Sequence, residues 1–200
     1  MAAKNALTVK SVDGLLKSML VLSRAVDHIL ENRAVEAAVG RPLSSSKVQI
    51  IRLLGQRGGQ TSTQVARFLG VSKPAVSQII DTMVREKFVV RRTAQHDRRE
   101  LNLQLSARGR QLFQAIRDEQ RYFVRNALRQ HTSPAPEKWV AVMQEISASL
   151  VQADHAYQHY CLQCGAHEDG SCVLVGGEAE CSFLKHTGRR RSSEPRVAAR

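Results

Sequence analysis

The chain has 200 residues, of which 42% are hydrophobic and only 4% aromatic, so its core depends on Leu, Val, Ile and Ala. This composition favours a helical protein over a β-sandwich or barrel. The formal net charge of +12 favours a polyanionic partner, nucleic acid first and an acidic membrane surface second. No segment supplies the roughly 18 uninterrupted apolar residues of a membrane span, and residues 1–10 lack the apolar run of a signal peptide. We therefore expect a cytoplasmic protein without a membrane partner.

The first expected element is a long helix. Apolar residues recur every three or four positions from Val12 to Leu30, which is the spacing of one helical face. The helix is expected to end near Gly40 and Pro42. Its apolar face is wider than one small domain needs, so it packs either inside the chain or against a second subunit. Residues 1–43 are interpreted as an N-terminal dimerisation helix.

Two further helices are expected before residue 70. The serines at 44–46 supply N-cap candidates for the first of them, and the paired glycines at 58 and 59 end it. Thr61 caps the next helix, Ser62 to Leu69. Gly70 just past its end fits a left-handed stop position, and Val71 can fill the corner that follows.

The fourth expected helix carries the candidate DNA-reading residues. Ser72 caps it, and Pro74 lies in its first turn, where a missing N–H costs nothing. One face is apolar, and the opposite face carries Lys73, Pro74, Ser77, Gln78, Asp81 and Arg85. A cation, a hydroxyl and an amide at the start of an exposed helix are groups that read base edges in a major groove. A merely solvated helix face is the alternative, and the helix and short turn before it favour DNA reading.

A two-stranded wing is expected next. Phe88 to Arg92 reads as one strand, and Leu101 to Leu105 alternates with period two and reads as its partner. The stretch from residue 85 to residue 110 holds eight cations and three acids, a net charge of +5. A cationic hairpin beside a reading helix can reach phosphates or the minor groove. The candidate contacts on this hairpin are Arg92, Arg98 and Arg99, and Asp97 can brace one arginine.

Two long helices follow the wing. Ser106 caps the first, which is expected to run to about Arg129 with a core face of Leu112, Ile116, Phe123, Val124 and Leu128. A proline-containing break at 131–136 precedes the second, whose apolar positions are Trp139, Val142, Met143, Ile146 and Leu150. Long helices on both sides of a DNA-reading unit suggest a two-fold dimer. Residues 44–110 are interpreted as the DNA-binding region and 111–160 as C-terminal dimerisation helices.

Together these elements predict a mainly α protein with a small β wing, a winged helix-turn-helix with flanking dimerisation helices. The motifs are T-x-x-x-V-A-x-x-L-G-V-S from Thr61, S-K-P-A-V-S-Q-I-I-D-T-M-V, V-V-R-R, D-R-R and L-S-A-R-G. In this order they resemble the MarR family of bacterial transcriptional regulators. The resemblance implies a homodimer that binds double-stranded DNA at a pseudo-palindromic operator. Many members bind small phenolic ligands between the two regions, but no residue in the sequence locates such a pocket.

The sequence departs from the family pattern at two places. Lys87 stands where the family usually has a glycine before the first wing strand. The run Gln95-His96-Asp97 replaces the usual acid, proline and second acid of the wing. Neither departure removes a groove contact.

All four cysteines lie in an added segment, residues 161–184. Cys161, Cys164, Cys172 and Cys181 have the spacing C-x2-C-x7-C-x8-C. Four thiolates suit tetrahedral zinc or an iron–sulfur cluster, and unligated thiols are the third alternative. The second pair does not repeat the first knuckle, so the spacing does not decide among them. The hypothesis is that the metal or redox state of this segment changes the dimer geometry. The alternative is a purely structural site that senses nothing.

The final stretch, residues 185–200, is a basic tail. It holds six cations against one acid, with Gly, Ser and Pro between them, and is expected to be disordered. Such a tail adds salt-sensitive DNA affinity that is independent of sequence.

Three classes of function follow from these patterns. A sequence-specific transcriptional regulator, controlled by a small-molecule or redox effector, is the leading one. An architectural protein that binds DNA with little sequence preference and carries a structural zinc is the alternative. An enzyme is disfavoured, because no phosphate-binding glycine loop, paired carboxylates or nucleophile set occurs.

Overall fold

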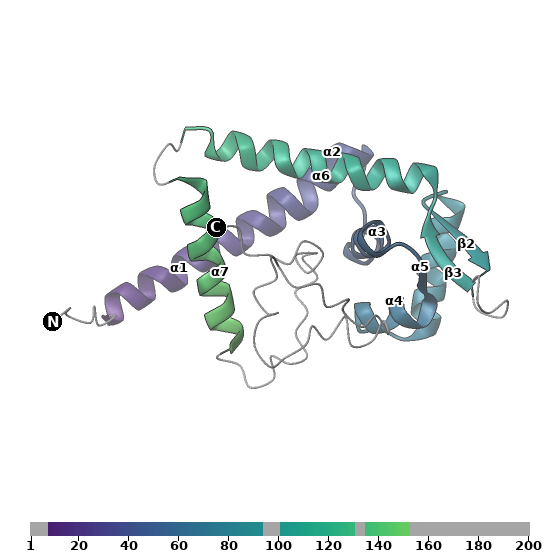
Figure 1. Cartoon of the computed structure of the whole chain (residues 1–200), viewed down its shortest axis with the longest axis horizontal. Helices are drawn as coiled ribbons and strands as arrows, with labels where there is room; N and C mark the ends of the chain where they lie inside the picture. Colours follow the sequence, from purple (N-terminus) through teal and green to yellow (C-terminus); the bar gives the residue numbers. More distant parts are fainter. Residues whose placement is uncertain (1–7, 94–100, 131–134, 153–200) are drawn as a thin grey trace, which may run out of the picture.

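The structure is a computed structural model that describes residues 8–93, 101–130 and 135–152 (Figure 1). Its helices are α1 (Val9–Ala25), η1 (Val26–Arg33), α2 (Ala34–Val39), α3 (Ser45–Arg57), α4 (Ser62–Leu69), α5 (Lys73–Arg85), α6 (Ala107–Leu128) and α7 (Pro136–Gln152). Its strands are β1 (Gln60–Thr61), β2 (Val89–Thr93) and β3 (Leu101–Leu105). The mainly α fold with a small β wing is therefore confirmed.

One continuous helical rod, α1–η1–α2, forms the N-terminal arm. It starts after the cap Thr8, whose hydroxyl accepts from the Ser11 N–H at 3.2 Å. It ends at Gly40, where a φ of +77° fits the glycine predicted to stop it. Its middle part, η1, is a π-helix, so each hydrogen bond spans one residue more than in an α-helix. The sequence pattern did not indicate this change of helical pitch.

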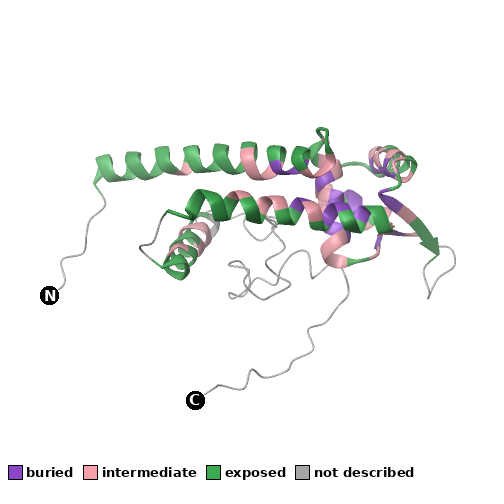
Figure 2. Cartoon of the chain, turned by 90° about the horizontal axis from the view of Figure 1, so that it is seen from above, coloured by how far each residue is buried: buried purple, intermediate pink, exposed green. Residues whose placement is uncertain are grey.

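The arm leaves most of its apolar side chains exposed. Figure 2 shows α1 as an exposed rod that projects from the buried centre of the chain. None of the residues of α1 is buried, and Leu15 and Leu16 are 43% and 54% exposed. Among the described residues the arm is anchored through α2, where Ala34 and Val35 pack under α6, and through η1, where Gln120 of α6 donates to the Leu30 carbonyl at 2.8 Å. Of the two alternatives for the apolar face, packing inside the chain holds for α2 but not for α1 among the described residues.

The helix-turn-helix forms as its caps predict. The Thr61 hydroxyl accepts from the Gln64 N–H at 3.2 Å, and the Gln64 side chain accepts from the Thr61 N–H at 2.8 Å, a reciprocal capping box. Gly70 ends α4 with φ +67°, and Ser72 caps α5. Val71 does not fill the corner as expected, since it is 42% exposed.

The hydrophobic core lies between α3, α4, α5, α6 and the sheet. Its largest fully buried side chains are Ile50, Ile51, Ile80, Met83, Leu103, Ile116, Val35, Val65, Val76 and Val89. They are aliphatic, as the composition indicated. The core therefore holds α5, the helix with the candidate DNA-reading residues, by its inner face and leaves its outer face to solvent.

The wing is part of a three-stranded antiparallel sheet with the order β1-β3-β2. Val89 pairs with Leu105 at the base and Thr93 with Leu101 toward the tip. The first wing strand begins one residue later than predicted, because Phe88 turns its ring into the core at 3% exposure. The short strand β1 was not predicted, since two residues carry no alternation.

The start of α6 is packed tightly against the start of the wing. The Ser106 N–H donates to the Phe88 carbonyl at 3.0 Å, and the Ser106 hydroxyl donates to the Lys87 carbonyl at 2.5 Å. A Cβ on Gly109 would lie 2.0 Å from the Phe88 carbonyl oxygen, so only glycine fits there. This contact fixes the direction in which α6 leaves the DNA-binding region.

The outer half of α6 differs from the prediction. Leu112 and Ile116 are buried as expected, and Phe113, not predicted, packs beside them against Gly55. Val124 and Leu128 were expected in the core but are 41% and 42% exposed. They lie beyond the core of this chain, on the part of α6 that extends away from the wing (Figure 1). The same holds for Val142, Met143 and Leu150 of α7, which are 54%, 53% and 58% exposed.

Among the described residues, no helix combines the length and the apolar content that crossing a bilayer requires.

We predict that Gly109→Ala lowers the free energy of unfolding by about 2 kcal/mol or more, because its methyl group must displace the Phe88 backbone. Urea unfolding followed by circular dichroism measures this change. Gly14→Ala is the matched control: its Cβ has nothing within 4 Å, and alanine in a helix should stabilise by about 0.5–1 kcal/mol. Equal effects of the two substitutions would contradict the prediction.

Candidate nucleic-acid interface

The outer face of α5 presents the predicted base-reading residues to solvent. Lys73, Pro74, Ser77 and Gln78 are all exposed, whereas Val76, Ile80 and Met83 are buried. The helix begins at a serine cap, with its free N–H groups and positive dipole end beside Lys73. This end can therefore approach a phosphate or a base edge, and the contact of these side chains with DNA stays a prediction.

The C-terminal half of the same face is tied to the wing. Arg91 of β2 forms an ion pair with Asp81 of α5 at 2.5 Å, with both side chains partly exposed. The Arg85 guanidinium donates to the Thr82 hydroxyl at 3.2 Å and remains exposed. The Asp81–Arg91 pair was not predicted from the sequence, because ten residues and an element boundary separate its members. The pair links β2 to α5 and neutralises an acid that would repel DNA.

The tip of the wing falls largely outside the described residues. Arg92 lies on β2, paired in register with Asn102, and is exposed. Asp97, Arg98 and Arg99 belong to residues 94–100, which the structure does not describe. Their predicted contacts with the phosphate backbone or minor groove stay predictions.

A charge cluster closes the C-terminal end of α5. Glu86 accepts from Lys47 Nζ at 2.9 and 3.0 Å and from Arg41 Nη2 at 2.9 Å. Burial raises the pKa of the Glu86 carboxyl, but the hydrogen bonds and the charges of Lys47 and Arg41 outweigh this, so the pKa lies below its usual value. The next residue, Lys87, has φ +62°, which explains why the family usually has glycine here.

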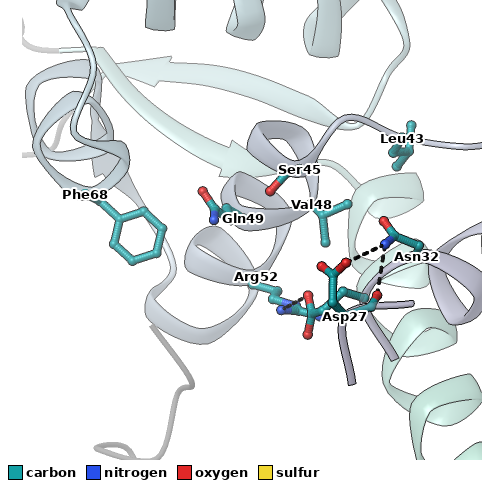
Figure 3. A pocket seen from close by; sticks show the side chains of 9 residues that line it. Asp27, Asn32, Leu43, Ser45, Val48, Gln49, Arg52 and Phe68 are labelled. Atoms are coloured by element: carbon teal, nitrogen blue, oxygen red, sulfur yellow. Dashed lines mark hydrogen bonds and ion pairs between the residues drawn. The ribbon is translucent and has the colours of Figure 1, made fainter. Parts of the chain in front are cut away.

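A cavity of about 290 Å³ lies between the arm and the DNA-binding region (Figure 3). Its lining combines η1, the start of α3 and one ring from α4: Asp27, Glu31, Asn32, Leu43, Ser45, Val48, Gln49, Arg52 and Phe68. Arg52 Nη1 pairs with Glu31 at 2.6 Å, while its buried Nη2 has no partner among the described residues. The cavity can thus offer the unpartnered Arg52 Nη2, further polar groups and an apolar wall to a small molecule. Sequence reasoning missed it because its walls come from three separate elements.

The four cysteines lie outside the described residues, so the structure places none of Cys161, Cys164, Cys172 and Cys181. Within residues 8–93, 101–130 and 135–152, no group of three His, Cys, Asp or Glu side chains could hold a metal ion.

The capped α4–α5 pair with its wing defines a winged helix-turn-helix protein. Residues 42–100 match the model of the MarR family, so this region of the chain is similar to that family. The HTH-type transcriptional repressor YetL of Bacillus subtilis (strain 168) is 28% identical over 98 residues, which are 48% of this chain and 56% of that protein. The chain therefore matches only about half the length of this curated relative.

Solved structures share the fold. RV1404 from Mycobacterium tuberculosis superposes with a TM-score of 0.58 at 20% identity, over 68% of this chain and 94% of that chain. YusO from Bacillus subtilis gives 0.56 at 18% identity, over 74% and 99%. At these identities the likeness shows the fold alone. The curated relative is a transcriptional repressor, which agrees with the expectation that this chain is not an enzyme.

Proposed function

We propose that the chain is a sequence-specific transcriptional regulator that binds a pseudo-palindromic operator as a homodimer in the cytoplasm. The observation that carries the proposal is the outer face of α5: Lys73, Ser77 and Gln78 are exposed at the start of a capped helix within the MarR-family region. Major-groove recognition uses such side chains from the first turns of a helix. One helix reads only a short half-site, so specificity requires a second copy.

The second candidate function is an architectural protein that binds DNA with little sequence preference and carries a structural zinc. The net charge of +12 favours it, because phosphate attraction alone gives affinity for any sequence. Selection of duplexes from random-sequence DNA by the wild-type chain separates the two. Enrichment of a two-fold symmetric site supports the regulator; a ratio of specific to non-specific affinity near one supports the architectural protein.

The two groups of candidate DNA contacts should respond differently to substitution. Gln78→Ala should relax the preference at one base position and cost about 1–3 kcal/mol on the selected site. Arg92→Gln should weaken binding to all sequences and lower the salt slope by about 1. Titrations on selected and scrambled duplexes at several salt concentrations measure both. The control is Arg125→Gln, which removes an exposed cation from the outer half of α6. If Arg125→Gln weakened DNA binding as much as Arg92→Gln, Arg92 would not be a specific phosphate contact.

The homodimer is supported by the exposed apolar residues of the arm, α6 and α7. Val12, Leu15, Leu16, Leu20, Leu22, Val124, Leu128, Val142, Met143 and Leu150 are each at least 41% exposed. A soluble monomer does not usually expose so many large apolar side chains on neighbouring helices, whereas a second copy can cover them.

We expect Leu15→Glu to convert the dimer to a monomer, because a carboxylate would be buried without a partner in the interface. Analytical ultracentrifugation over a range of concentrations measures the association. Lys17→Glu is the control, since two residues further along α1 the side chain faces about 200° around the helix. Dimers of unchanged affinity in Leu15→Glu would show that this face is not the interface.

We further propose that Cys161, Cys164, Cys172 and Cys181 bind Zn²⁺, with an iron–sulfur cluster as the alternative. The support is chemical: four thiolates within 21 residues satisfy the coordination number of either centre. Whether the centre senses redox state or only stabilises the segment is part of the same test.

Protein purified without oxygen should be colourless and contain about one zinc per chain. A brown colour with iron and sulfide would instead establish the cluster. Cys164→Ser should lose the metal, and its operator affinity, measured with and without oxidant, should change if the segment is a sensor. Unchanged affinity in both conditions would leave only the stabilising role.

The cavity beside Arg52 is the proposed site of a small-molecule effector. Phe68 and Val48 supply an apolar wall, and Arg52 Nη2 supplies a donor. A small aromatic molecule with one acceptor group fits this lining, because one of the two acids is already paired with Arg52.

Salicylate, a small phenolic acid, is a suitable probe of this cavity. It should raise the thermal unfolding midpoint of the wild-type chain through binding to the folded state. The shift should disappear in Arg52→Gln and persist in Arg125→Gln. A shift of the same size in both variants would place the ligand elsewhere.

A further inference from the structure

Glu86 lies where three segments of the chain meet. It is the C-cap residue of the recognition helix α5. Its two cationic partners come from 39 and 45 residues earlier in the sequence: Lys47 in the first turn of α3, and Arg41 in the link between the N-terminal arm and α3. One carboxylate thus joins the end of the recognition helix to the chain that leaves the arm.

The ion pairs of Glu86 are partly buried on the Lys47 side, whereas Arg41 is 49% exposed. Lys47 reaches both carboxylate oxygens, at 2.9 and 3.0 Å, and its side chain is only 16% exposed. Glu86 itself is 23% exposed. Fully exposed pairs contribute little because water screens them, whereas a partly covered pair with hydrogen bonds to both carboxylate oxygens restricts its partners more strongly.

The backbone at Glu86 ends α5 and is followed directly by a turn. The Glu86 N–H closes the last turn of α5 on the Thr82 carbonyl at 2.9 Å, and Lys87 then reverses the chain with φ +62°. This conformation is sterically unfavourable for lysine but not for glycine. The Glu86 side chain holds this end of α5 from one side, and the Ser106 hydroxyl on the Lys87 carbonyl holds it from the other.

We propose that Glu86 is a positioning residue for operator binding, which fixes the recognition helix relative to the N-terminal arm through Arg41 and Lys47. The inference rests on the proposed function and adds a residue that touches no DNA. In a dimer whose arms pair, the separation and tilt of two recognition helices depend on how rigidly each helix is held to its arm. A loose connection would admit several half-site spacings, and specificity would fall.

The sign of the expected effect separates positioning from simple electrostatics. Removing an acid from a DNA-binding protein ordinarily strengthens its attraction to every phosphate. If Glu86 positions α5, its neutralisation should instead weaken binding to the selected site while non-specific binding stays the same or rises. The ratio of the two affinities is therefore the quantity to measure.

The experiment compares Glu86→Gln with wild type on the duplex that the wild-type chain selects and on a scrambled duplex of equal composition. We expect the ratio of specific to non-specific affinity to fall at least about fivefold. Adding Arg41→Gln to Glu86→Gln should reduce the ratio no further, because both changes break the same link. Selection with the Glu86→Gln protein should return a wider range of half-site spacings.

Glu36→Gln is the matched control, because it removes one acid from the exposed side of α2, where Glu36 forms no ion pair with a described residue. Its affinity ratio should equal that of wild type. Circular dichroism and sedimentation should show that Glu86→Gln is folded and dimeric, so that a lower ratio belongs to the folded protein.

Two results would overturn the inference. If the wild-type ratio of specific to non-specific affinity is well above one and that of Glu86→Gln lies within twofold of it, only the positioning role is refuted. A wild-type ratio near one would refute the proposed function and this inference together.

Discussion

The backbone contact between α6 and Phe88 governs how the parts of this chain are joined. The first turn of α6 lies so close to the Phe88 carbonyl that position 109 must be glycine. At the same point the recognition helix ends, the wing begins and the longest helix departs toward α7 (Figure 1). A packed junction of this kind transmits displacement instead of absorbing it, because the interior has no free volume. Through this contact the start of α6 is joined directly to the end of α5 and the base of the wing.

The parts of the fold that could be predicted from the sequence depend mostly on interactions between residues close together in the chain. Side-chain caps at Thr61, Ser72 and Ser106 fixed the starts of three helices, and Gly40 and Gly70 fixed two ends. These signals involve atoms within a few residues of each other, so they can be read without knowledge of the tertiary structure. The polar outer face of α5 was predictable for the same reason, since helical periodicity separates it from the core.

What the sequence did not predict depends on contacts between distant residues. The Glu86 cluster and the Asp81–Arg91 pair each join separate elements, and charged residues give no sign of which partner they will meet. The wrong assignment of Val124 and Leu128 to the core has a related cause. Apolar periodicity indicates that a face will be covered, but it does not distinguish cover by the same chain from cover by another.

The π-helix η1 has a consequence for the reach of the arm. Each residue turns an α-helix by about 100°, and a π-turn holds one residue more than an α-turn. The segment Val26–Arg33 therefore sets the angle between the apolar stripe of α1 and the side of α2 that packs under α6. Loss of a single residue there would change the hydrophobicity of the arm little but rotate α1 by about 100° relative to α2. The apolar stripe of α1 would then face a different side of the molecule, so this short segment determines the orientation of the N-terminal arm about its own axis.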